Sequence, residues 1–201
     1  MSEQILEHLF DSPVKVKIYK LFLRNAGKYF SLPEIAKKTQ SNSRVVKRQV
    51  NGLLSISFLR RKKVKASRKK GIKGGIYFSV NTQFDFFNEL NNLILKSSPT
   101  SKEKMLRRIM KLGRIKMALI SGVFLNTDNS RVDLFLVGDD ISERKLRKFL
   151  SDMEAEVGRE IVYAALTSKE FDYRFHMFDR FVRDILEKPH EKMINKVKFI
   201  D

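Results

Sequence analysis

The chain of 201 residues contains no cysteine and only three histidines, His8, His176 and His190, which lie far apart. Without cysteine there is no disulfide scaffold, no thiol nucleophile and no thiolate-bound zinc, and three scattered histidines do not form a local metal site. We therefore expect no metal and no cofactor. The lack of cysteine also favours a reducing, cytoplasmic location.

Long apolar runs are missing as well. No stretch approaches the roughly 20 apolar residues that a membrane-spanning helix needs. The first residues, MSEQILEHLFD, carry acids where a signal peptide has a basic start and an apolar core. Hydrophobic residues still make up 42% of the chain, which is enough for packed cores and excludes the disordered and fibrous classes. We expect a soluble protein with no membrane partner.

Acidic residues are absent from one long part of the chain. No Asp or Glu occurs between Glu34 and Asp85, a stretch that holds 14 basic residues. The net charge is +18, and dividing the chain before Pro99 assigns +14 to the first part and +4 to the second. A fold does not require such an excess, whereas a polyanionic partner would relieve its self-repulsion. The charge predicts that the first part binds a polyanion.

Ser, Thr and Pro cluster at residues 97–101 between two periodic segments, which is typical of a linker. We therefore predict two domains, residues 1–98 and 99–201. No internal repeat is present.

Three helices are predicted near the N-terminus. Asp11-Ser12-Pro13 starts a helix that extends to about Asn25. Ser31 and Glu34 have the spacing of a capping box and open a helix to about Thr39. A third helix runs from Ser43 to about Ser55.

The third helix has two unlike faces. The apolar residues Val46, Val50, Leu53 and Leu54 recur on one face, and the opposite face is basic or amide. Two short helices joined by a tight turn, the second with a donor-rich outer face, have the geometry that enters a DNA major groove, where Arg binds guanine and Asn binds adenine.

A basic hairpin is predicted next, with strands at 58–64 and 75–80. Nine of the 14 residues from 60 to 73 are Lys or Arg, which suits contact with phosphates. A helix over Phe84–Lys96 follows, with enough apolar residues to contact a second copy of the chain or the second domain. The predicted DNA contacts are Ser43, Arg44, Lys47, Arg48, Asn51, Lys62, Lys63, Lys65, Arg68, Lys69, Lys70 and Lys73.

The stretch SLPEIAKKTQSNSRVVKRQVNGLLSISFLRR resembles the winged helix-turn-helix domain of prokaryotic transcriptional regulators. The resemblance covers roughly residues 10–96. It implies double-stranded DNA as the partner and a homodimer that binds an inverted repeat.

The second part reads as an α/β domain. Helices are predicted over 102–112, 141–157 and 168–186, and buried strands over 115–120, 132–137 and 161–166. In the last helix, Phe171, Phe175, Phe178, Val182 and Ile185 form one stripe and are expected in the core.

Over about residues 115–186 the chain resembles the minimal nucleotidyltransferase domain. The resemblance is carried by the segment SGVFLNTDNSRVDLFLVGDD and the later segment EAEVGREIVYAALTSKEFDYRFHMFDRFVRDIL. In active members a Gly-Ser pair holds the nucleotide phosphates, and an Asp-x-Asp pair and a third carboxylate bind magnesium. Here Gly122 is kept, Val123 replaces the serine, Arg131 and Asp133 stand at the acidic pair, and Val162 is at the third position. One carboxylate beside an arginine cannot hold two magnesium ions, so we expect no catalytic activity.

Structural roles are expected for the other polar residues of this part. Asp133 is expected to bind Arg131 or a loop amide. Asp139 and Asp140 are expected to start the following helix, where acids suit the helix dipole. His176 is expected to be packed or half-exposed, and His190 to lie on the surface.

These observations predict a sequence-specific, double-stranded-DNA-binding transcriptional regulator, with an inactive nucleotidyltransferase-like domain used for dimerisation or sensing. One alternative is an active nucleotidyltransferase that the basic domain brings to a nucleic acid. Another alternative is an RNA-binding module. The only evidence against it is the lack of aromatic residues on the basic face, because proteins that bind single-stranded RNA usually stack bases on aromatic rings. The residues identify neither the operator nor a small-molecule or nucleotide effector.

Overall fold

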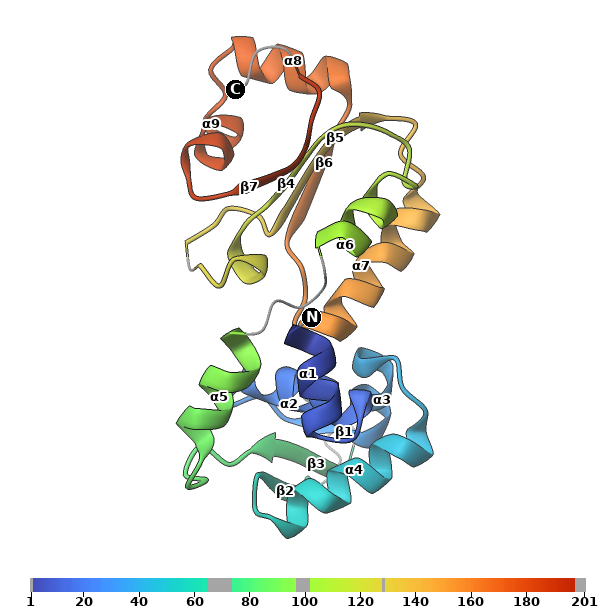
Figure 1. The fold of residues 1–201 in the computed structure, drawn as a ribbon, viewed down its shortest axis with the longest axis vertical. Coiled ribbons are helices and arrows are strands. Elements are labelled where there is room, and N and C mark those ends of the chain that lie inside the picture. Colours follow the sequence, from blue (N-terminus) through green and yellow to red (C-terminus); the bar gives the residue numbers. More distant parts are fainter. Residues whose placement is uncertain (1, 65–73, 97–101, 128, 198–201) are drawn as a thin grey trace. The chain divides into compact units, whose positions relative to one another are not determined.

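The computed structural model describes residues 2–64, 74–96, 102–127 and 129–197, which form a mixed α/β structure with two sheets (Figure 1). It divides into two compact units, Met1–Ser97 with Glu154–Arg159, and Ser98–Met153 with Glu160–Asp201. The predicted linker at 97–101 lies outside the described residues. Within those residues, no helix has the length and apolar character needed to cross a membrane.

The first unit contains five helices and three strands among its described residues. In chain order they are α1 (Ser2–Leu9), α2 (Pro13–Leu23), β1 (Phe30–Ser31), α3 (Leu32–Thr39), α4 (Ser43–Ser55), β2 (Leu59–Val64), β3 (Gly75–Val80) and α5 (Phe87–Lys96). The three predicted N-terminal helices are confirmed as α2, α3 and α4. The helix expected from Phe84 begins three residues later, at Phe87, and α1 and β1 were not predicted.

Local capping explains where these helices begin. The Ser12 hydroxyl accepts a hydrogen bond from the Lys15 backbone N–H at 3.2 Å. The backbone N–H of Ser31 donates to the Glu34 carboxylate at 2.7 Å, as the capping box predicts. Asn42 accepts from the Arg44 N–H at 2.9 Å, and α4 starts at Ser43, three residues after the left-handed C-cap of α3, Gln40. The α3–α4 connection is therefore tight.

The three strands form an antiparallel sheet in the order β1-β3-β2. The β2–β3 register runs from Leu59 opposite Val80 to Val64 opposite Gly75, which confirms the predicted hairpin. Phe30 of β1 lies opposite Phe78 of β3. Most of the predicted basic tip, residues 65–73, lies outside the described residues.

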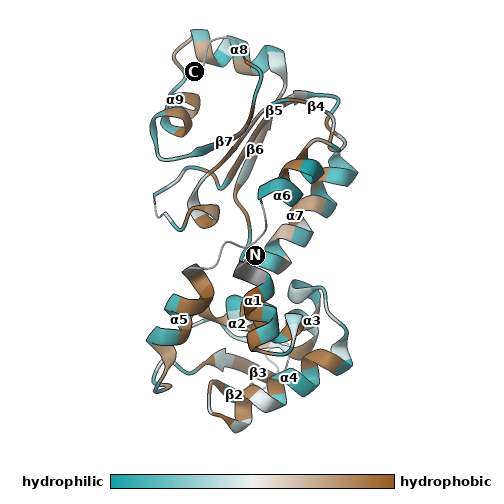
Figure 2. Ribbon diagram, viewed as in Figure 1, coloured by the Kyte–Doolittle hydropathy of each residue, from teal (hydrophilic) through white to brown (hydrophobic). Residues whose placement is uncertain are grey.

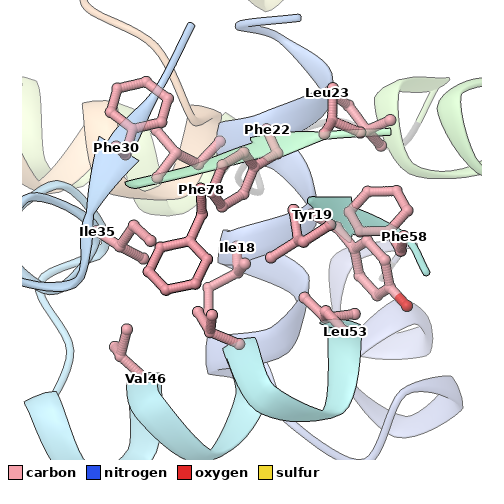
Figure 3. Packing of buried hydrophobic residues seen from close by; sticks show 14 of the residues in the cluster. Ile18, Tyr19, Phe22, Leu23, Phe30, Ile35, Val46, Leu53, Phe58 and Phe78 are labelled. Atoms are coloured by element: carbon pink, nitrogen blue, oxygen red, sulfur yellow. The ribbon is translucent and has the colours of Figure 1, made fainter. Parts of the chain in front are cut away.

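Aromatic and branched side chains from α2, α3, α4 and the sheet meet in one core (Figure 3). Ile18, Phe22, Ile35, Val46 and Phe58 are completely buried there. Tyr19 packs edge-on against Phe58, with ring centroids 4.7 Å apart. Each large side chain buried in this way stabilises the fold by about 1.5–3 kcal/mol, so the core fixes α4 relative to the hairpin.

The described part of the second unit contains a four-stranded sheet and four helices. In chain order they are α6 (Lys102–Ile109), β4 (Arg114–Ile120), β5 (Leu134–Asp139), α7 (Glu143–Val157), β6 (Tyr163–Leu166), α8 (Ser168–His176), α9 (Arg180–Glu187) and β7 (Glu191–Asn195). The strand order is β6-β5-β4-β7; β5 and β6 are parallel, and the other pairs are antiparallel. The strand β7 was not predicted.

The two central strands are buried on both faces, which explains why their sequences are almost continuously apolar. On one face Met117, Leu119, Phe135 and Val137 pack with residues of α8 and α9, among them Phe171 and Val182. The residues that alternate with these are also buried, on the face where Figure 1 shows α6 and α7.

The prediction of a single helix over 168–186 is wrong, because the helix is interrupted between α8 and α9. Phe178 adopts a left-handed backbone with φ +53° and is 77% exposed, so it does not join the core stripe. Asp179 caps a new helix by accepting a hydrogen bond from the Val182 N–H at 3.1 Å. Phe171 is buried as expected, and Phe175 is partly buried against the same cluster.

The role predicted for Asp139 and Asp140 is also wrong. Asp139 ends β5 and accepts hydrogen bonds from the N–H and hydroxyl of Ser168, at 3.0 and 2.8 Å, so it holds the start of α8 instead of α7. Asp140 pairs with Arg114 at 2.6 Å, and α7 begins only at Glu143.

Candidate functional site

The outer face of α4 is polar and open to solvent. Val46, Val50 and Leu53 are buried on its inner face, and Leu54 is partly buried. Figure 2 shows the corresponding alternation of hydrophilic and hydrophobic residues along this helix. All five side chains predicted here as DNA contacts are exposed: Ser43, Arg44, Lys47, Arg48 and Asn51.

Cations on α4 and β2 lack acidic partners. Within the described ranges, no ion pair involves Arg44, Lys47, Arg48, Arg61 or Lys63. The second unit differs, because many of its cations face a carboxylate: Lys102, Arg108, Arg114, Lys116, Arg131, Arg147, Arg174 and Arg183. The unneutralised charge of the first unit therefore includes the surface of α4 and the hairpin.

The two faces of the hairpin carry different cations. Residues directly opposite each other in antiparallel strands share a face. Arg61 lies opposite Phe78, whose side chain is in the core, so Arg61 and Lys63 belong to the face on which the helices pack. Arg60 and Lys62 belong to the other face. All four are exposed.

Within the described residues, Arg60 and Lys62 on that other face have side-chain partners. The Lys62 ammonium lies 5.3 Å from the centroid of the Tyr29 ring. The Arg60 guanidinium donates to the Gln83 side-chain oxygen at 3.3 Å. The remaining predicted contacts, Lys65, Arg68, Lys69, Lys70 and Lys73, lie outside the described residues.

In the second unit, a buried carboxylate joins three segments. Asp133 is 3% exposed, and its two oxygens accept hydrogen bonds from the backbone N–H groups of Val123 and Val162, at 2.8 and 2.9 Å. The structure thus brings together Gly122, Val123, Asp133 and Val162, four of the positions expected from the resemblance to nucleotidyltransferases. The loop amide expected as a partner of Asp133 is confirmed.

Gly122 makes room for this carboxylate. Its φ is +54°, and a Cβ atom added there would lie 2.2 Å from Asp133 Oδ1. Only glycine adopts this backbone at little cost while leaving space for the oxygen. Gly122 thus permits close packing within the loop.

Arg131 does not bind Asp133. Its Nε lies 2.8 Å from Oδ2 of Asp184 in α9, and this hydrogen bond is the main reason that the pKa of Asp184 lies below its ordinary value. Sequence reasoning missed Asp184, because the contact joins residues 53 positions apart.

The described residues contain no group of three or more His, Cys, Asp or Glu side chains placed to hold a metal ion. The expectation that His176 is packed or half-exposed is wrong, because its side chain is exposed; its Nδ1 lies 2.8 Å from the Asp172 carbonyl oxygen. His190 is half-buried beside the Lys188 carbonyl, so it is less exposed than predicted.

Comparison of the chain with protein-family models, with curated proteins and with solved structures gave no match.

Proposed function

We propose that the protein is a sequence-specific transcriptional regulator that binds double-stranded DNA through its first unit. The observation that carries the proposal is a set of exposed cations on α4 and on one face of β2 that make no ion pair among the described residues. They lie in a segment without a single acid between Glu34 and Asp85. Arg and Asn side chains on a helix are suited to read base edges, and Lys and Arg on a hairpin are suited to bind phosphates.

The arrangement of the first unit supports a winged helix-turn-helix assignment. Two short helices, α3 and α4, are joined by a tight turn and followed by a two-stranded ribbon. In such a domain the second helix enters the major groove. By this assignment α4 is the reading helix and the β2–β3 hairpin is the wing.

In the second unit, the order α6-β4-β5-α7-β6 supports a nucleotidyltransferase-like domain without catalytic activity. Both oxygens of Asp133 accept backbone hydrogen bonds, and Arg131 holds Asp184. Nucleotide transfer depends on positioned divalent cations. With Asp133 bonded to two backbone N–H groups and Asp184 bonded to Arg131, too few carboxylate oxygens remain to bind them. We assign the unit to dimerisation or sensing.

DNA binding is tested first by its salt dependence. For about five to eight phosphate contacts, the logarithm of the binding constant should fall with the logarithm of salt concentration with a slope near −5 to −7. Selection from a random duplex library would supply the preferred site. A slope close to zero, or preference for single-stranded RNA over the selected duplex, would contradict the proposal.

Sequence reading is tested on α4. Arg44→Ala and Asn51→Ala should each relax preference at one or two base pairs by about 1–3 kcal/mol. Arg147→Ala, which removes an exposed cation from α7, is the charge-matched control for Arg44→Ala and should leave the preference unchanged. If Arg147→Ala has the same effect as Arg44→Ala, α4 does not read the sequence.

A further inference from the structure

Three of the four sheet edges within the described residues are protected against pairing with another strand. Edge strands are kept from such pairing by shortness or by charge. β1 has only two residues, β2 carries four consecutive cations from Arg60 to Lys63, and β7 carries Glu191 and Lys192.

The fourth edge, β6, has four residues, twice as many as β1, and carries no charge. It pairs with β5 on one side only, within the part of the chain that the structure describes. The eight residues 161–168 contain no charged side chain. Val162, just before the strand, is 54% exposed, and Tyr163, its first residue, is 44% exposed. Ala165, nearer the end of the strand, is also exposed. An uncharged, apolar edge of this kind is a template for a further strand.

We propose that β6 is the dimer interface, and that it pairs antiparallel with β6 of a second copy about a twofold axis. The two four-stranded sheets would then form one continuous sheet. The occupant is a second copy because a twofold interface requires a surface that is complementary to itself, and an uncharged strand edge meets that condition. A chain of net charge +18 repels its own copies, so a neutral edge is a favourable place for them to meet.

The side chains of β6 fit a pairing centred on Ala164. Directly opposed residues in antiparallel strands share a face. Because side chains alternate between the faces along a strand, two opposed residues must differ in number by an even count. Centring on Ala164 places Tyr163 opposite the partner's Ala165, and Val162 opposite the partner's Leu166. The large Tyr163 ring then lies opposite a small residue, which leaves room for it on the shared face. This inference does not depend on DNA binding.

The first test is the mass of the full chain in solution at micromolar concentration, by sedimentation. The wild type should be a dimer, and Ala165→Lys should raise the dissociation constant at least tenfold, because two added cations would face the shared edge. Tyr173→Lys adds the same charge at a residue that is 67% exposed and belongs to helix α8 instead of the strand, and should leave the dimer intact.

The second test uses the absence of cysteine. Ala164→Cys introduces the only thiol, and in the proposed register it lies opposite its own copy at a Cα separation of roughly 4.5–5.5 Å, which a disulfide can bridge. A mild oxidant should therefore convert this variant to a covalent dimer, while Tyr173→Cys should not cross-link. Three outcomes would each overturn the proposal. The wild type could be monomeric, Ala165→Lys could weaken the dimer no more than Tyr173→Lys does, or Ala164→Cys could fail to cross-link.

Discussion

Lys62 lies over the ring of Tyr29, whereas its neighbour Lys63 is on the opposite face of the same strand and makes no ion pair within the described residues. By the proposed winged helix-turn-helix assignment, we expect DNA bound to the outer side of α4 to meet the hairpin on the face that carries Lys63. Lys63→Gln should therefore lower the slope of the salt dependence by about 0.9, the value for one lost phosphate contact.

Lys62→Gln is the matched control, since it removes the same charge from the adjacent residue. Although the sequence predicted Lys62 as a DNA contact, its ammonium lies over Tyr29 on the face opposite Lys63. We therefore expect no phosphate contact at Lys62 and a slope within about 0.3 of the wild type. Both slopes are measured by titrating the selected duplex at several salt concentrations. Equal effects of the two substitutions would show that the hairpin faces do not differ in their contacts.

Asp133→Asn should destabilise the protein. The asparagine amide group cannot accept a hydrogen bond, so the N–H of Val123 or of Val162 would lose its partner in a buried place. The expected loss is about 1–3 kcal/mol in the free energy of unfolding, measured by urea denaturation. Asp172→Asn, at an exposed carboxylate, should change that free energy much less. Equal losses would exclude a special role for the buried carboxylate.

The second unit should transfer no nucleotide. The chain would be incubated with each labelled nucleoside triphosphate, magnesium or manganese, and itself, DNA or RNA as acceptor. We expect no transfer, because by the proposed assignment Arg131 and Val162 replace carboxylates that would hold divalent cations. Label transfer that Asp133→Ala abolishes would reverse this conclusion and favour an enzyme.

Phe178→Asn should stabilise the protein. Phe178 has a left-handed backbone, which disfavours bulky residues and which asparagine tolerates better, and its 77% exposed side chain contributes little packing. A gain of about 0.5–1 kcal/mol in the free energy of unfolding is expected. Tyr173→Asn, at an exposed position inside α8, should have the opposite sign because asparagine is a weaker helix former. A loss of stability in Phe178→Asn would mean that the exposed ring has a partner.

The carboxyl of Asp184 should contribute to the loss of folding stability in acid. The hydrogen bond from Arg131 keeps the pKa of this carboxyl below its ordinary value of 3.8 in the folded protein. The folded state therefore binds this proton less readily than the unfolded state, so the stabilisation is complete above pH 3.8 and disappears as the pH falls through the folded value. Urea denaturation from about pH 6 to about pH 2.5 should show a shallower acid loss in Asp184→Asn than in the wild type. Identical pH profiles would contradict this assignment.

Periodicity and capping predicted most of the first unit, because α4 and its neighbours are specified locally. The spacing of Val46, Val50 and Leu53 was sufficient to identify the exposed face that carries Arg44 and Asn51. The break after α8 was missed because no glycine or proline marks it; the available signal was Asp179, which has the side chain of a helix cap. The partners of Lys62 and Arg131 could not be predicted, since Tyr29 and Asp184 are brought to them only by tertiary folding.

The strand β7 has a consequence for the order in which the chain folds during synthesis. β4 begins at Arg114, but one of its two neighbouring strands is β7, which ends at Asn195. Until the ribosome has made that segment, the backbone of β4 has an unpaired side that other nascent chains could bind. The second sheet is therefore completed after the β1-β3-β2 sheet, which has all its strands once Val80 has emerged.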